Sequence, residues 1–224
     1  VRELPGNHLT QSTSTKRPLL GRMPATGVRN LLTYSDDVLG SGWSPSTGDI
    51  KVHAALVQSG VTLSSIVPTS TSNGKGSYIN QSLPSGTCLS LYVKANGYRY
   101  VQIYDAGSAT LGALVFDAQS GVFSTNSDGK TVSVSSLGGG LYRISVVTTA
   151  FYGPYGASVC ISGTPGNNYG YYAQTGDGVS GMYLGSCQAE AGSTPTAYQK
   201  VVQPYDITES GVASVYTAYF DGVD

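Results

Sequence analysis

Short apolar segments alternate with turn-forming clusters from about residue 30 to residue 198. A half-buried β-strand alternates apolar and polar residues, because successive side chains point to opposite faces. Segments of this kind are Val52–Val57, Val61–Val67, Cys88–Lys94, Tyr98–Asp105, Ala113–Phe116, Leu141–Thr148, Ala157–Ser162 and Gly181–Ala189. No stretch keeps a helical period over three turns. The pattern therefore predicts an all-β protein.

Clusters of Gly, Asn, Asp and Ser separate these segments. They are 72–76, 95–97, 127–129, 138–140 and 176–178. Many short strands at such spacing are typical of a sandwich or jelly roll. We predict a jelly-roll β-sandwich of two antiparallel sheets, preceded by an extended N-terminal arm.

One hairpin can be predicted in detail around Asn96-Gly97. A three-residue loop, Ala95–Gly97, pairs Tyr92 with Tyr100 and places the apolar residues of both strands on one face. The other face would then carry Tyr92, Tyr98, Tyr100, Gln102 and Tyr104.

Both ends of the chain differ from its middle. Residues 1–28 are polar and basic and contain Pro5, Pro18 and Pro24, which predicts an extended arm or linker. Residues 29–200 form the expected sandwich. Residues 201–224 are expected to be a connector and the first strand of a following domain, so that the chain would be part of a longer protein.

Composition narrows the class of protein. Charged residues make up 11% of the chain, against about 25% in an average globular protein, and the formal net charge is −1. A nucleic-acid-binding protein usually carries a strong positive excess, and a membrane-spanning helix needs a run of about 18 apolar residues. Neither feature is present in the sequence. We expect neither a nucleic-acid partner nor membrane insertion.

The three cysteines, Cys88, Cys160 and Cys187, each lie in a strand-like segment. An odd number without a CxxC spacing favours buried thiols over a disulfide framework. Trp43 is expected in the core. Asp36, Asp37 and Asp177 are candidate calcium ligands, because β-sandwich modules often hold a structural calcium ion. The favoured alternative is turn formation by Asp, and no cofactor is otherwise expected.

No catalytic motif is found: the sequence has no GxSxG, HExxH, phosphate loop or dinucleotide fingerprint. Glycoside hydrolysis needs two carboxyl groups close together in a cleft. The sequence does not show which acidic residues of the β region lie close together, so a hydrolase stays an alternative. Gln102-Ile103-Tyr104 is similar to the Gln-Ile/Val-His strand of jelly-roll alginate lyases, but the histidine is missing.

Binding is better supported, because no residue from Ile144 to Gly176 is charged although the segment is rich in tyrosine and glycine. Aromatic rings contact sugar C–H groups, and tyrosine hydroxyls and amides match sugar hydroxyls. The same residues also suit a protein interface or the filling of a pleated sheet. The candidate contacts in this region are Tyr152, Tyr155, Tyr169, Tyr171 and Tyr172.

Several segments, in order, together resemble a domain that recurs in tail, fibre and other structural proteins of tailed phages and prophages. They are Arg29–Asp36 (RNLLTYSD) with Trp43, Leu91–Ala95 (LYVKA), Phe116–Gly121 (FDAQSG), Gly140–Ser145 (GLYRIS), Thr175–Leu184 (TGDGVSGMYL) and Gln188–Tyr198 (QAEAGSTPTAY). The resemblance implies a carbohydrate-binding-module-like jelly roll in a virion.

Two positions depart from that family, which commonly has Trp where Leu141 and Gly185 stand. Sugar contacts at these two positions are therefore in doubt. Residues 219–224 resemble the entry to a concanavalin- or laminin-G-like sandwich, which often follows the domain.

These observations predict a non-catalytic, phage-type structural or adhesion module, located in the virion or outside the cell. Its expected partners are a surface polysaccharide or glycan and other virion proteins, within a fibre that could be homo-oligomeric. One alternative is a carbohydrate-binding module of a polysaccharide-degrading enzyme. A second is a jelly-roll polysaccharide lyase or glycoside hydrolase.

Overall fold

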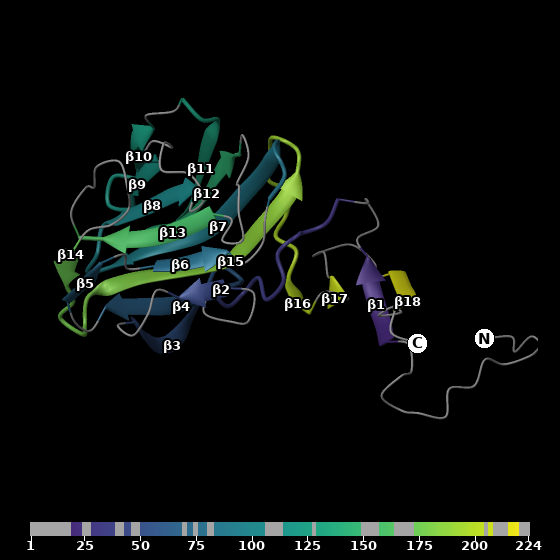
Figure 1. Cartoon of the computed structure of the whole chain (residues 1–224), viewed down its shortest axis with the longest axis horizontal. Helices are drawn as coiled ribbons and strands as arrows, with labels where there is room; N and C mark the ends of the chain where they lie inside the picture. Colours follow the sequence, from purple (N-terminus) through teal and green to yellow (C-terminus); the bar gives the residue numbers. More distant parts are fainter. Residues whose placement is uncertain are drawn as a thin grey trace, which may run out of the picture.

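The computed structural model describes residues 19–23, 28–38, 43–45, 50–68, 71–73, 76–79, 83–105, 114–126, 129–148, 157–163, 173–203, 206–207 and 215–219. These residues form strands, bends and turns and contain no helix. Figure 1 shows most of the strands gathered into a β-sandwich, with a small sheet to one side. The all-β prediction and the prediction of a sandwich are confirmed.

Two six-stranded sheets form the sandwich, and every strand pair in them is antiparallel. Sheet I has the order β10 (Val122–Asn126), β9 (Leu114–Asp117), β8 (Tyr100–Asp105), β13 (Ala157–Ser162), β6 (Gly76–Ile79) and β2 (Trp43–Pro45). Sheet II has the order β11 (Val132–Gly138), β12 (Leu141–Val147), β7 (Thr87–Asn96), β15 (Gly181–Ala191), β4 (Val61–Pro68) and β3 (Ile50–Gln58). Each of the segments predicted to be strands overlaps one of these strands, although Tyr98 and Arg99 precede β8.

The main core lies between the two sheets. Alternation decides which residues enter it: on β7 the apolar members of the pattern are buried in the core, and on β8 Val101 and Ile103 are. Trp43, only 4% exposed, belongs to the same core, as predicted. The three cysteines are buried, which confirms the prediction of buried thiols.

The predicted hairpin between β7 and β8 is wrong. β7 pairs with β12 and β15 in sheet II, whereas β8 pairs with β9 and β13 in sheet I. The chain crosses from one sheet to the other over 97–99: the Tyr98 amide donates to the Gly181 carbonyl at 2.9 Å, and the Arg99 amide donates to the Ser162 carbonyl at 3.2 Å. An arch between sheets and a hairpin within one sheet both keep apolar faces toward the core, so alternation alone does not distinguish them.

A second, smaller apolar cluster covers the outer face of sheet II. Val61, Leu63, Tyr92 and Leu141 are buried in it, and Leu56, Leu137, Tyr183 and Tyr198 pack against it. Tyr198 comes from the segment after β15. Sheet II is therefore packed on both faces, and its outer face is partly closed by the chain that leaves the sandwich.

Two further sheets are small. One has the order β16 (Val201–Gln203), β17 (Asp206–Ile207), β1 (Leu19–Met23) and β18 (Val215–Tyr219), and the other pairs β14 (Ala173–Thr175) with β5 (Thr71–Asn73). β1 belongs to the predicted N-terminal arm, and its pairing with β18 was not expected. Residues 1–18 lie outside the described part of the chain, and the predicted boundaries at residues 28 and 200 stay predictions.

The tight crossing between the sheets predicts that a side chain at position 97 lowers the stability of the protein. Its φ is +93°, and an added Cβ would lie 2.6 Å from the Ser180 Cβ. Gly97→Ala should lower the free energy of unfolding in urea by about 2–4 kcal/mol, because steric overlap adds to the strain of the left-handed region. Gly86 has a similar φ of +78° with nothing within 4 Å, so Gly86→Ala should cost only about 1–2 kcal/mol. Equal losses in the two variants would contradict the tight packing of the crossing.

Candidate functional site

The tyrosine face predicted between 92 and 104 does not exist as one surface. Tyr92 lies on the outer face of sheet II, 7% exposed, beneath Tyr198 and Arg143. Tyr98 is 8% exposed and packs in the main core, and its burial raises its pKa. Tyr100 and Gln102 alternate with the core residues of β8 and therefore belong to the outer face of sheet I.

Of the residues predicted on that face, Tyr100 is half-buried, whereas Gln102 is 1% exposed and its side-chain nitrogen has no hydrogen-bond partner. For Tyr104 the structure gives only the backbone register, opposite Ser158 of β13. Tyr152, Tyr155, Tyr169, Tyr171 and Tyr172 lie outside the described residues, so their predicted role in binding stays a prediction.

Arg99 and Tyr100 form a fixed polar and aromatic surface at the start of β8. Arg99 donates from Nε and Nη2 to the two carboxylate oxygens of Asp117, with Nε–Oδ1 at 2.6 Å and Nη2–Oδ2 at 2.5 Å. Its guanidinium carbon lies 5.2 Å from the centroid of the Tyr100 ring, which is a cation–π distance. The Arg99 side chain remains 41% exposed. The pair therefore offers ligand-accessible atoms held in one orientation.

Asp117 is the anchor of this surface. It also accepts hydrogen bonds from the Gln119 amide at 2.9 Å and the Ser120 hydroxyl at 2.6 Å. The hydrogen bonds from Arg99, helped by those from Ser120 and Gln119, outweigh partial desolvation and hold the pKa of Asp117 well below its usual range. Asp117 is thus a permanent carboxylate that orients Arg99.

Asp177 shapes its own turn. Its carboxylate accepts the Val179 amide at 2.8 Å and, from Ser180, the amide at 2.6 Å and the hydroxyl at 2.7 Å. The Ser180 hydroxyl and the two amides lower the pKa of Asp177 from 3.8 to about 2. This is the turn chemistry that the sequence favoured over a calcium ligand.

An extensive polar network joins residues 28–38 to strand β15. β4 pairs with β15 only at Met182–Leu184, and a bulge follows, at which Ser186 has a φ of +45°. Beyond the bulge the N-terminal segment replaces β4: the Leu31 amide donates to the Ala189 carbonyl at 2.6 Å, and the Cys187 amide donates to the Ser35 carbonyl at 2.7 Å. Residues 30–35 thus act as an irregular neighbouring strand.

Asn30 completes this pairing with its side chain. Its Oδ1 accepts the amides of Leu32 and Ala189, both at 3.0 Å, and its Nδ2 donates to the Cys187 carbonyl at 2.9 Å. The Asn30 backbone amide donates to Gln199 Oε1 at 3.1 Å. The buried Asn30 amide thereby satisfies backbone groups of β15 that lie beyond its pairing with β4.

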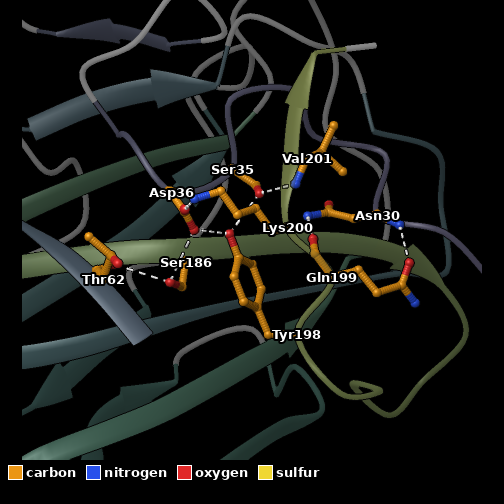
Figure 2. A network of polar contacts seen from close by, with 9 residues as sticks. All are labelled: Asn30, Ser35, Asp36, Thr62, Ser186, Tyr198, Gln199, Lys200 and Val201. Atoms are coloured by element: carbon orange, nitrogen blue, oxygen red, sulfur yellow. Dashed lines mark hydrogen bonds and ion pairs between the residues drawn. The ribbon is translucent and has the colours of Figure 1, made fainter. Parts of the chain in front are cut away.

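Asp36 lies at the other end of the network, shown in Figure 2. The Tyr198 hydroxyl donates to Asp36 Oδ1, and Lys200 forms an ion pair with Oδ2. Burial and the neighbouring Asp36 both raise the pKa of Tyr198, so it stays a neutral donor. The Ser35 hydroxyl lies 2.7 Å from the Tyr198 hydroxyl and accepts the Val201 amide at 2.8 Å. Asp36, a predicted calcium candidate, is used here as an internal acceptor.

Glu190, completely buried, is a second internal acceptor. It accepts Gln188 Nε2 at 2.6 Å, the Thr196 amide at 2.8 Å and the Thr196 hydroxyl at 2.6 Å. Arg143 donates to the Thr196 carbonyl at 2.6 Å and fixes the same segment on sheet II. The segment after β15 is therefore bonded to the sheet along its length.

Positions 141 and 185, where the sequence differs from the phage-type domain that it resembles, are both tightly packed. Leu141 is completely buried in the outer cluster. A Cβ at Gly185 would lie 2.7 Å from the Thr62 carbonyl oxygen and 3.2 Å from that of Asp36. Because backbone fills this space, position 185 has no room for a tryptophan in this arrangement.

Sequence reasoning missed the roles of Ser35, Ser186, Tyr198, Gln199 and Lys200. Each of them has at least one partner more than 100 residues away along the chain, which no local spacing indicates. Asp37, the third calcium candidate, is exposed. Within the described ranges, no three His, Cys, Asp or Glu side chains are grouped closely enough to hold a metal ion. The described residues likewise include no helix long and apolar enough to cross a membrane.

No protein-family model matches the sequence, and no curated protein matches it.

The network predicts a loss of stability for Tyr198→Phe. The variant keeps the ring that meets Tyr92 edge-on at 6.2 Å but removes the hydroxyl donor to Asp36. We expect the free energy of unfolding to fall by about 1–3 kcal/mol, because a partly buried carboxylate loses a hydrogen bond. Tyr183→Phe, on the same face but outside the network, should change it by no more than about 0.5 kcal/mol. An unaffected Tyr198→Phe protein would show that the hydroxyl is dispensable.

The lowered pKa of Asp177 predicts that part of the protein's stability is lost in acid. Since folding lowers its pKa from 3.8 to about 2, the stabilisation is complete above 3.8 and is lost as the pH falls through about 2. Unfolding free energies measured from pH 5 to pH 2 should therefore decline more steeply for the wild type than for Asp177→Asn, which keeps a turn-forming acceptor. Parallel profiles would contradict this assignment.

Proposed function

We propose that the chain is a non-catalytic adhesion module of a phage-type structural protein that binds a surface polysaccharide. The observation that carries the proposal is the surface made by Arg99 and Tyr100. Its ring supplies an apolar face for sugar C–H groups, and the guanidinium supplies N–H donors for sugar hydroxyls.

Preorganisation supports this site. The bidentate contact with Asp117 and the cation–π contact with Tyr100 fix Arg99 before a ligand arrives. Binding then costs less side-chain entropy than it would with a mobile arginine. Two of the five guanidinium N–H groups are used on Asp117, so the group can serve as a structural anchor and still donate to a ligand.

The state of the acids supports a non-catalytic role. General acid–base chemistry needs carboxyl groups that face a substrate and titrate near the working pH. Asp36, Asp117, Asp177 and Glu190 each accept two or more hydrogen bonds from their own surroundings. They stabilise turns and connections, a use that fits a binding module.

The phage part of the proposal is supported by the family resemblance of residues 29–198. The resembling segments include Leu91–Ala95 in β7, Gly140–Ser145 at β12 and Gln188–Tyr198 at the end of β15. In tail and fibre proteins such a domain would meet cell-surface glycans or other virion proteins, and the low net charge is compatible with a neutral glycan.

A binding assay on neutral and acidic bacterial polysaccharides tests the proposal. The wild type should bind a neutral polysaccharide, and Tyr100→Ala should weaken the affinity about tenfold or more, as expected for an aromatic anchor. Tyr183→Ala, on the outer face of sheet II, is the matched control and should bind like the wild type. Wild-type protein that binds no polysaccharide, or equal binding by Tyr100→Ala, would reject the site.

The same incubations separate adhesion from catalysis. Polysaccharide recovered after prolonged contact with the protein should show no new reducing ends and no unsaturated sugars. Either product would overturn the non-catalytic assignment and favour a lyase or a hydrolase.

A further inference from the structure

Strand β11 forms an exposed edge of sheet II. Among the described strands it pairs only with β12, and residues 133–136 are all exposed. The side chains of Val132 and Val134 lie on the core side of the sheet, since their partners across β12 are Val146 and Ile144. Val134 is nevertheless 36% exposed. The core of the sandwich is thus incompletely covered at this edge.

The other edges of the two large sheets carry features that discourage further pairing. Proteins protect sheet edges with charged residues, proline, bulges or very short strands. On sheet II, β3 contains Lys51 and His53 and a bulge between His53 and Leu56. On sheet I, β2 has three residues and contains Pro45, and β10 has a bulge between Phe123 and Thr125.

β11 lacks most of these features. Its sequence, VSVSSLG, contains no charged residue and no proline, and its ladder with β12 is regular from Val132 to Ser136. The one register shift, at Ser136–Gly138, lies next to the turn into β12. A regular, uncharged and exposed strand presents a row of backbone donors and acceptors to another strand.

We propose that β11 is a homodimer interface, in which the same strand of a second copy pairs with it antiparallel across a two-fold axis. Sheet II of one copy and sheet II of the other then form one continuous sheet. A register centred on Val134 places Val134 opposite its copy, Val132 opposite Ser136 and Ser133 opposite Ser135. The exposed valines of both copies become covered on the core side.

Two observations favour a second copy as the occupant. A two-fold axis brings each residue near its own copy, so any charge in the strand would face the same charge, and β11 has none. On the outer face, Ser133 and Ser145 hydroxyls already hydrogen-bond across the β11–β12 pair at 2.6 Å. Ser135 of the second copy continues this serine row by the same cross-strand contact.

The neighbouring edge of sheet I is compatible with this arrangement. Strands β10 and β11 follow one another in the chain and lie at the same side of the sandwich (Figure 1). β10 is also uncharged, and its Val122 is 53% exposed. The interface is independent of the proposed polysaccharide binding, because Arg99 and Tyr100 are not part of it.

The test is the molar mass of the full chain, measured by light scattering over a wide range of concentrations. The wild type should show a monomer–dimer equilibrium. Val134→Lys and Val134→Glu should each weaken dimerisation about tenfold or more, because like charges face each other at the axis. An equimolar mixture of the two variants should restore the dimer through opposite charges.

Val57→Lys is the matched control, since Val57 is a 69% exposed valine on β3, the opposite edge of the same sheet. It should dimerise like the wild type. Hydrogen exchange of the wild type gives a measurement that needs no variant: amides of residues 132–136 should become protected as concentration rises. A wild type that stays monomeric, dimers insensitive to Val134→Lys, or β11 amides that gain no protection would each overturn the proposal.

Discussion

The sandwich depends on how β15 satisfies its backbone after the bulge at Ser186. A central strand needs a hydrogen-bonded neighbour on each side, and β4 serves β15 only at Met182–Leu184. Residues 30–35 take over from there, with the Asn30 side chain accepting the Ala189 amide and donating to the Cys187 carbonyl. Without this segment, buried donors and acceptors of a core strand would lack partners, which is among the costlier defects of a protein interior.

This arrangement also explains the polar residues that surround it. The Gln199 side chain accepts a hydrogen bond from the Asn30 amide and donates one to the Val28 carbonyl. Asp36 accepts a hydrogen bond from Tyr198 and forms an ion pair with Lys200. The entering and leaving segments are therefore joined to β15 and to each other. Asp36, which the sequence offered as a calcium ligand, therefore has a structural use in this network.

The sequence predicted the strands well because each depends on local alternation. The pattern on β7 and β8 correctly separated core residues from outward ones, and burial of the cysteines and Trp43 followed from their apolar surroundings. It failed where the outcome depends on distant contacts. The three residues 97–99 cross between sheets because Gly97 fits against Ser180, a contact that no local pattern contains. The network of Asp36 and Tyr198 was missed for the same reason.

Placing the segments before and after the sandwich side by side has a mechanical consequence. A pull applied to residue 28 from one side and residue 203 from the other would act first on the contacts between Asn30 and Gln199 and between Ser35 and Val201. The force path would run through this short junction and bypass the two sheets. The junction would thus bear tension applied to these two segments before the sheets of the sandwich do.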